Sequence, residues 1–258
     1  MGFIYAGIIL LACILGAIVG LGGGVFIRPI FDAIGVHSVL NISFLSSSAI
    51  LTMAIVSTYA KVKTGLEIDY KMAALISSGA VIGGTIGNIV LEHLIYIFYP
   101  HEYRVQQAQI IVTVIVLSIS LIFTHKNYLR YELKNKFVLL PLGILLGSSA
   151  VFMGIGGGPV NVPVFMILFG LPIKKATAYS IIIIFFSHLS SIISILSTAT
   201  PGYLDFPMLI FVFPAAALGG IIGAKFSNIF SSKVVKRLFM AAITGVILLN
   251  IFNGIFIL

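Results

Sequence analysis

Residues 21–31, LGGGVFIRPIF, return about 134 positions later as IGGGPVNVPVF at residues 155–165. In each copy a long apolar segment runs into three glycines, and a short apolar segment of about eleven residues follows and stops at a polar turn. At about 1.5 Å per residue, this short segment reaches only about 16 Å, half of a hydrocarbon core of roughly 30 Å. The sequence therefore predicts two broken-helix hairpins. We call residues 20–24 the first glycine break and residues 154–158 the second.

The composition indicates an integral membrane protein. Hydrophobic residues make up 60% of the 258 residues, charged residues make up 9%, and the mean hydropathy is +1.19. A soluble core of this size cannot bury so much apolar surface, so the solvent must be lipid. Apolar runs of about 18 to 22 residues predict six spanning helices besides the hairpins: 39–60, 72–91, 106–124, 177–197, 207–224 and 237–257.

The positive charges predict the topology. The net charge of +8 comes from basic residues in short loops beside helices, which indicates membrane topology rather than nucleic-acid binding. If each hairpin enters and leaves on one side, 13 of the 15 lysines and arginines share a side. They lie in loops 61–71, 125–136, 171–176 and 225–237. If each hairpin is instead counted as one crossing, the basic residues are divided 7 to 8 between the two sides of the membrane. The first arrangement puts the basic loops in the cytoplasm and both termini on the non-cytoplasmic side of the cell membrane.

Landmarks beyond the breaks predict an internal duplication. Gly65 and Asp69 have counterparts in Gly202 and Asp205, each just before a helix. Small residues of the following helix also recur: Ala80, Gly83, Gly84 and Gly87 match Ala216, Gly219, Gly220 and Gly223. We expect an all-α polytopic membrane protein with two inverted repeats, each a broken-helix hairpin plus three transmembrane helices. The first transmembrane repeat is residues 1–125, the basic cytoplasmic linker is 126–136, and the second transmembrane repeat is 137–258.

Together these motifs resemble the TauE/SafE family of sulfite and organosulfonate exporters over nearly the full chain. The resemblance rests on the two breaks, each with a proline five residues on (Pro29 and Pro163), on the Gly65…Asp69 loop and on the Gly83-Gly84 helix. It implies transport of a small sulfur-containing anion, which composition and spacing alone do not show. No nucleotide-binding loop occurs in the sequence. We therefore expect no cofactor and a coupling ion, a proton or sodium, as the driving force.

The glycines themselves are the first candidate substrate-binding residues. A glycine run exposes backbone N–H groups, and the short helix after each break points its N-terminus, the positive end of its dipole, at the break. Two such ends facing each other near the midplane would bind an anion. The alternative is that the glycines only permit the bend and close packing. The residues concerned are Gly22, Gly23, Gly24, Gly156, Gly157 and Gly158.

Polar side chains near the breaks extend the candidate site. Arg28 either holds the anion or pairs with Asp32 one turn further on, and Asn161 is a candidate donor to substrate oxygens. His188, at the middle of its helix, either carries a proton coupled to the anion or bonds as a neutral ring to a serine or carbonyl. Serines at helical spacing either line a hydrated path or only join helices. Those nearest the breaks are Ser46, Ser47 and Ser187.

Two further patterns limit the function. All seven acidic residues are expected in loops, in the short arm or at helix ends, which leaves no intramembrane carboxylate for a cation site. Small residues at every fourth position predict packing faces. They are Gly79, Gly83 and Gly87 in the first repeat, and Ala215, Gly219 and Gly223 in the second.

The sequence thus favours a secondary transporter, an exporter working by alternating access, whose partners are a small anion, membrane lipid and a coupling ion. One rival is a passive anion channel that uses the same two breaks. The other is an intramembrane hydrolase using Ser148 or Ser149 with His188, which is disfavoured because neither serine lies in a G-x-S-x-G elbow. We therefore expect no enzymatic activity.

Overall fold

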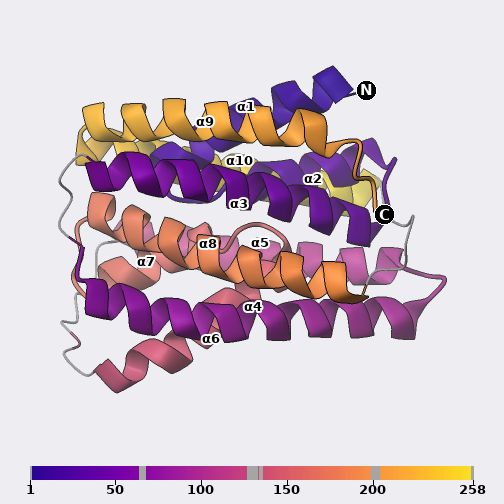
Figure 1. Cartoon of the computed structure of the whole chain (residues 1–258), viewed down its shortest axis with the longest axis horizontal. Helices are drawn as coiled ribbons and strands as arrows, with labels where there is room; N and C mark the ends of the chain where they lie inside the picture. Colours follow the sequence, from indigo (N-terminus) through magenta and orange to yellow (C-terminus); the bar gives the residue numbers. More distant parts are fainter. Residues whose placement is uncertain (1, 64–67, 127–132, 134–135, 199–203, 257–258) are drawn as a thin grey trace.

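The computed structural model describes residues 2–63, 68–126, 133, 136–198 and 204–256, and every regular element within these ranges is helical (Figure 1). Gly65, Gly202 and most of the linker 126–136 lie outside the described residues. A short 3-10 helix, Lys136–Val138, precedes α6. The α-helices are α1 (Gly2–Val19), α2 (Gly24–Ile34), α3 (Val39–Lys63), α4 (Tyr70–Phe98), α5 (Tyr103–Lys126), α6 (Leu139–Met153), α7 (Gly158–Leu168), α8 (Ile173–Thr198), α9 (Leu209–Ile229) and α10 (Ser232–Phe256).

Seven helices of the described residues are long and apolar enough to cross a membrane. Six of them, α3, α4, α5, α8, α9 and α10, are the predicted spans. The seventh is α1, the long arm of the first hairpin, which has 18 residues. The short arms α2 and α7 have 11 residues each, so the predicted short segments are confirmed. The chain is an all-helical, multi-pass membrane protein.

Each hairpin enters and leaves at one end of the molecule (Figure 1). Helix α2 returns to the end where α1 begins and α10 finishes, which we call the terminal end. Helix α7 returns to the opposite end, where α3 meets α4 and α9 meets α10, which we call the basic end. The described lysines of the loops 61–71, 171–176 and 225–237 flank the helix junctions at the basic end.

The small-residue stripes of α4 and α9 pack against other helices, as predicted. A Cβ added to Gly79 would lie 2.9 Å from Gly143 Cα on α6, and one added to Gly219 would lie 2.7 Å from Cys13 Cβ on α1. Such close backbone approach is the usual role of glycines spaced by four in membrane helices. Helix α4 is thereby joined to α6, and α9 to α1.

One acidic residue does not lie where the sequence pattern indicated. Glu92 lies within α4, which continues to Phe98 rather than ending near Leu91. Its carboxylate accepts hydrogen bonds from Asn88 Nδ2 at 2.7 Å and from Thr198 Oγ1 at 2.8 Å. The expectation that all acidic residues lie outside the spans or at their ends is therefore wrong, because the apolar run after Glu92 extends the helix.

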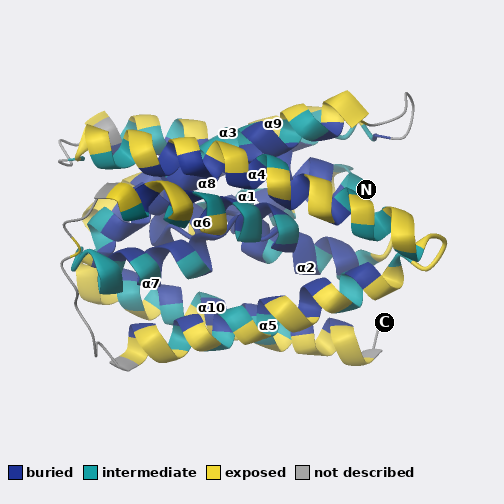
Figure 2. Cartoon of the chain, turned by 90° about the horizontal axis from the view of Figure 1, so that it is seen from below, coloured by how far each residue is buried: buried dark blue, intermediate teal, exposed yellow. Residues whose placement is uncertain are grey.

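Buried residues concentrate in the middle of the molecule, while α5, α9 and α10 show exposed outer faces (Figure 2). Many exposed residues on those faces are large and apolar, such as Ile210 (72%) and Ile229 (76%) of α9. Apolar side chains directed outward suit a lipid solvent. The polar residues described below are therefore enclosed by helices rather than directed at lipid.

Candidate functional site

The two glycine breaks are in direct contact, and we call this contact the crossing. A Cβ added to Gly22 would lie 3.4 Å from Gly156 Cα, and one added to Gly158 would collide with the backbone of Leu21. Side chains other than hydrogen would force the two breaks apart. Left-handed backbone, which favours glycine, occurs at Gly20 (φ 73°), Gly22 (76°), Gly154 (64°), Gly156 (84°) and Gly157 (67°).

Both short helices begin at the crossing and run to opposite ends of the molecule (Figure 1). The positive ends of their dipoles therefore both face it. The first turns differ in the donors they offer. In α7, Gly158 N donates to Gly156 O (2.8 Å), Pro159 has no N–H, and Val160 N and Asn161 N donate to Gly157 O. The first turn of α7 thus offers no free backbone donor, although the N–H groups of Gly156 and Gly157 in the break have no protein acceptor among the described residues.

Helix α2 offers more backbone donors. Its N-cap, Gly23, makes no side-chain capping bond, while Phe26 N and Ile27 N both donate to Gly23 O at 3.1 Å. Within the described residues, the N–H groups of Gly24 and Val25 have no protein acceptor. Unsatisfied N–H groups at a helix N-terminus are the usual anion-binding donors. The first turn of α2 thus offers more free N–H groups than the first turn of α7.

Asn161 adds a side-chain amide to the crossing. The residue is fully buried, and neither its Nδ2 nor its Oδ1 has a hydrogen-bond partner among the described residues. A Cβ added to Gly157 would lie 3.4 Å from Asn161 Nδ2, so the amide lies beside the second break. Leaving a buried amide unsatisfied costs about 1–3 kcal/mol. A bound oxyanion would satisfy the N–H groups of this side chain.

His188 and Ser47 form a pair next to the crossing. His188 Nδ1 lies 3.0 Å from Ser47 Oγ, while its Nε2 has no partner among the described residues. Ile184, one turn before His188 on α8, would contact a Cβ on Gly22 through its Cδ1 at 3.4 Å. The ring is fully buried, and no described residue competes with a ligand or a proton for its second nitrogen.

The other candidate serines bond within their own helices. Ser46 Oγ donates to Ser43 O at 3.3 Å, and Ser187 Oγ donates to Ile184 O at 3.2 Å. The backbone of Ser187 lies against Gly84 of α4. Both serines are buried, and their hydroxyls join helix turns in this conformation.

The positions of Ser148 and Ser149 do not support the hydrolase alternative. Ser148 Oγ donates to Leu145 O at 3.1 Å and Ser149 Oγ donates to Leu146 O at 3.0 Å. His188 instead bonds Ser47. A serine nucleophile needs a base within hydrogen-bond reach, and neither serine bonds to one among the described residues.

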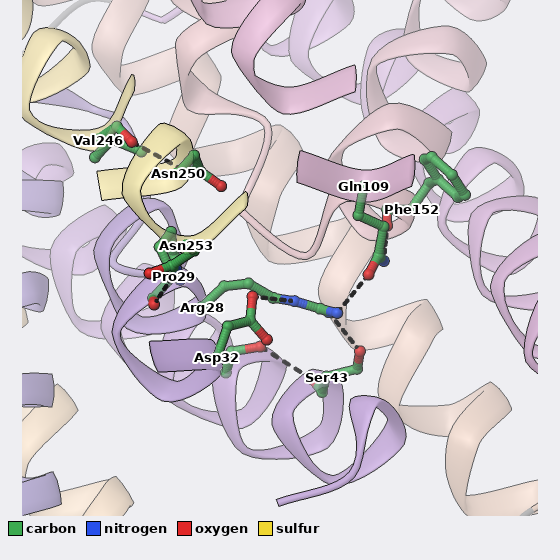
Figure 3. A network of polar contacts seen from close by, with 10 residues as sticks. Arg28, Pro29, Asp32, Ser43, Gln109, Phe152, Val246, Asn250 and Asn253 are labelled. Carbon is green, nitrogen blue, oxygen red and sulfur yellow. Dashed lines mark hydrogen bonds and ion pairs between the residues drawn. The ribbon is translucent and has the colours of Figure 1, made fainter. Parts of the chain in front are cut away.

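Arg28 of α2 lies among Asp32, Ser43 and Gln109 (Figure 3). Its Nε lies 3.6 Å from Asp32 Oδ2, its Nη1 donates to Ser43 Oγ at 2.8 Å, and its Nη2 donates to Gln109 Oε1 at 2.5 Å. A Cβ added to Gly154 would lie 2.6 Å from Arg28 Nη1. The ion pair with Asp32, one of the two alternatives considered for Arg28, is present, and the same guanidinium also lies against the second break.

Sequence reasoning missed two amides that support this arrangement. Gln109 of α5 accepts the hydrogen bond from Arg28 through its Oε1, and its Nε2 donates to Phe152 O at 2.6 Å. Asn253 of α10 donates to Pro29 O at 2.7 Å. Both are amide residues within apolar spans, and a polar amide inside such a span is the signal that could have marked them. They fix the position of α2 and of the Arg28 guanidinium.

Comparisons with known proteins agree with this architecture. The chain matches the protein family described as Sulfite exporter TauE/SafE over residues 5–249. It is 26% identical to the probable membrane transporter protein YunE of Bacillus subtilis, with 96% of each chain covered. It is also 26% identical to a probable membrane transporter protein of Methanocaldococcus jannaschii, with 90% of this chain and 88% of that one covered. No solved structure is significantly similar.

Proposed function

The chain belongs to the sulfite exporter TauE/SafE family, and on that premise we propose that it exports a small sulfur-containing anion, such as sulfite or an organosulfonate. The family is one of transporters rather than enzymes. Its related proteins are named as probable membrane transporters without a stated substrate. The substrate class therefore comes from the family description, and the mechanism from the arrangement of this chain.

The crossing is the observation that carries the proposal. Two positive helix ends converge there, the N–H groups of Gly24 and Val25 have no protein acceptor among the described residues, and the buried Asn161 amide has no partner. Sulfur oxyanions carry negative charge on several oxygens, each of which accepts hydrogen bonds from N–H groups. Opposed half-helix ends are also where secondary transporters bind anionic groups. This supports a substrate site at the crossing.

Alternating access is the mechanism that suits this arrangement. The crossing is buried from both ends of the molecule, so substrate entry requires movement of one hairpin against the other. We infer two inverted repeats, 1–125 and 137–258, joined by the linker 126–136. The opposite directions of the two hairpins support this inference. The positive-inside rule then puts the basic end in the cytoplasm and both termini outside.

A coupling ion completes the proposed cycle. His188 is the candidate proton carrier, because its Nε2 is buried next to the crossing and has no partner among the described residues. Sodium is the alternative ion. The rate of sulfite efflux from proteoliposomes distinguishes the two ions. It should depend on a proton gradient across the membrane if the proton is coupled, and on a sodium gradient if sodium is coupled.

Counterflow distinguishes the transporter from the passive anion channel. Proteoliposomes loaded with unlabelled sulfite should accumulate external labelled sulfite transiently, and the initial rate should saturate with concentration. A carrier exchanges substrate through one site, whereas a channel only dissipates the gradient. Flux that is linear in sulfite and shows no counterflow would favour the channel.

Asn161→Leu should separate binding from stability. The substitution removes a buried amide that has no partner among the described residues, so we expect folding stability to be retained or to rise by up to about 1–3 kcal/mol. Sulfite affinity should fall about tenfold through loss of a charged hydrogen bond. Thermal unfolding and sulfite titration of the purified protein measure the two effects.

Asn250→Leu is the matched control. Asn250 is also buried, but its Nδ2 donates to Val246 O at 2.9 Å within α10. This variant should keep the sulfite affinity of the wild type. Equal affinities in all three proteins would remove Asn161 from the site.

A further inference from the structure

Glu92 is a carboxylate within a membrane span that the substrate site at the crossing does not use. It lies in α4, which ends at Phe98 at the terminal end of the molecule (Figure 1). Its side chain is half-buried. Within the described ranges, no lysine, arginine or histidine forms an ion pair with its carboxylate. Such a charge within a membrane is expensive and marks ion or substrate pathways.

Three polar side chains of α4 and α8 surround this carboxylate. Asn88 Nδ2 donates to Glu92 Oε1 at 2.7 Å and to Ser194 Oγ at 3.0 Å. Thr198 Oγ1 donates to the same carboxylate oxygen at 2.8 Å. On each helix the two residues are four positions apart, so they share a face. We call Asn88, Glu92, Ser194 and Thr198 the terminal cluster.

The amide oxygen of Asn88 is the observation that points to a ligand in this cluster. Asn88 is fully buried, and its Oδ1 has no hydrogen-bond partner among the described residues. This oxygen shares its carbon atom with Nδ2, so it lies beside Glu92 Oε1 and Ser194 Oγ. A buried acceptor without a partner is costly. A bound cation would satisfy it without requiring a further donor from the protein.

The other oxygens of the terminal cluster also keep lone pairs for a cation. A hydroxyl oxygen has two lone pairs. Ser194 Oγ accepts one hydrogen bond, and Thr198 Oγ1 acts only as a donor in its bonds to described residues. Both contacts of Glu92 use Oε1 and leave Oε2 without a bond to a described residue.

The kind of cation follows from these oxygens. They come from one carboxylate, one amide and two hydroxyls, so the cluster carries a single negative charge. Oxygen ligands suit hard cations. Calcium takes about six to eight oxygen ligands, more than these four side chains supply. A monovalent hard cation, sodium, matches the charge and the number of ligands better.

Helices α4 and α8 also connect the terminal cluster to the crossing. Thr85 Oγ1 and Ser190 Oγ lie 2.6 Å apart on the crossing side of the cluster. Further along, a Cβ added to Gly84 would collide with the Ser187 carbonyl. His188, the next residue of α8, lies beside the crossing. A cation that holds α4 and α8 together therefore acts on the helix that carries His188.

We propose that the terminal cluster binds a sodium ion and that this site couples sulfite export to a sodium gradient. The cluster lies at the terminal end, which the proposed topology puts outside the cell. Sodium entering from that end would move opposite to sulfite leaving from the basic end, as in an antiporter. The coupling rests on the proposed function, whereas the sodium site is tested without any substrate.

Glu92→Gln tests the charge of the site. Radiolabelled sodium is titrated onto detergent-purified protein without sulfite, and choline chloride keeps the ionic strength constant. The wild type should bind sodium saturably, and its Kd should rise about tenfold or more in the variant, which keeps the shape of the side chain but removes its charge. Unlabelled sodium should compete better than calcium. Stronger competition by calcium would identify a divalent site and overturn the proposal.

Glu102→Gln is the matched control. Glu102 lies in the turn between α4 and α5 at the same end of the molecule, so the variant makes the same chemical change outside the cluster. It should keep the sodium Kd of the wild type. Equal weakening by Glu102→Gln, an unchanged Kd in Glu92→Gln, or no saturable sodium binding by the wild type overturns the sodium site.

Ser194→Ala decides the matter if Glu92→Gln does not fold. It removes one hydroxyl ligand and should weaken sodium binding about threefold. Ser197→Ala is its control, because Ser197 Oγ donates to Ser194 O at 2.7 Å within α8, and this variant should keep the wild-type Kd. A folded Ser194→Ala protein with an unchanged sodium Kd overturns the site.

Sulfite efflux from proteoliposomes tests the coupling. Replacing external sodium by choline should slow wild-type efflux at least about fivefold, the lower end of the usual coupling between two sites. Glu92→Gln should lose this dependence. Sodium binding together with efflux that ignores external sodium would overturn the coupling. Wild-type protein that binds sodium but shows no saturable sulfite flux would refute the proposed function and the coupling, but not the sodium site.

Discussion

Gly158→Ala is expected to cost about 3 kcal/mol or more of folding stability. The added methyl group would meet backbone atoms, which cannot move aside as a flexible side chain could. A Cβ on Gly158 would collide with Leu21 Cα, Leu21 C and Gly20 O. The two breaks would have to separate, which displaces the first turns of both short helices. Thermal unfolding of the detergent-purified variant measures the loss, and sulfite flux should disappear with it.

Gly245→Ala is the control for this prediction. Nothing lies within 4 Å of a Cβ at Gly245 in α10, and alanine favours helix by up to about 1 kcal/mol over glycine. This variant should be as stable as the wild type or slightly more so, with normal sulfite flux. A Gly158→Ala protein of wild-type stability would mean that the breaks are not in contact.

Arg28→Met should destabilise the protein by about 3–5 kcal/mol, the usual cost of removing one partner of a buried ion pair. Arg28 is 3% exposed and Asp32 is 5% exposed, and the variant leaves the carboxylate buried without its cation. The double variant Arg28→Met/Asp32→Asn removes both charges and should regain most of that stability. Thermal unfolding of the single and double variants measures this recovery.

The double variant also distinguishes the two roles considered for Arg28. If the guanidinium holds substrate, the restabilised protein should bind sulfite about tenfold more weakly than the wild type. Unchanged sulfite affinity would leave Arg28 with a pairing role only. Arg104→Met, which removes an exposed arginine in the first turn of α5, should change neither stability nor affinity.

Features that depend on nearby residues could be predicted from the sequence. The three glycines followed by a short apolar segment predicted both hairpins, and glycines at every fourth position predicted the packing of α4 and α9. The i,i+4 spacing also indicated the Arg28–Asp32 pair as one of two alternatives for Arg28. Each of these is fixed by helix periodicity or by segment length, which a single sequence contains.

Contacts between distant segments could not be predicted in the same way. Gln109 meets Arg28, and Lys61 meets Thr177 and Ser227, across separations of 81, 116 and 166 residues. No local pattern specifies which face of α5, α8 or α9 turns toward them. The position of Glu92 was predicted wrongly for a local reason. A charged residue after a long apolar run resembles the end of a helix, whereas α4 continues to Phe98.

Thermal stabilisation by anions tests the central claim most directly. Purified protein is heated with sulfite, sulfoacetate, sulfate, acetate or chloride at matched ionic strength, beside Asn161→Leu. A ligand that binds only the folded state adds about 2.7 kcal/mol of stability at 100 times its Kd. We predict a selective rise with sulfite or sulfoacetate that is strongly reduced in Asn161→Leu. Equal shifts with every anion, or a sulfite shift that survives in Asn161→Leu, would contradict an oxyanion site at the crossing.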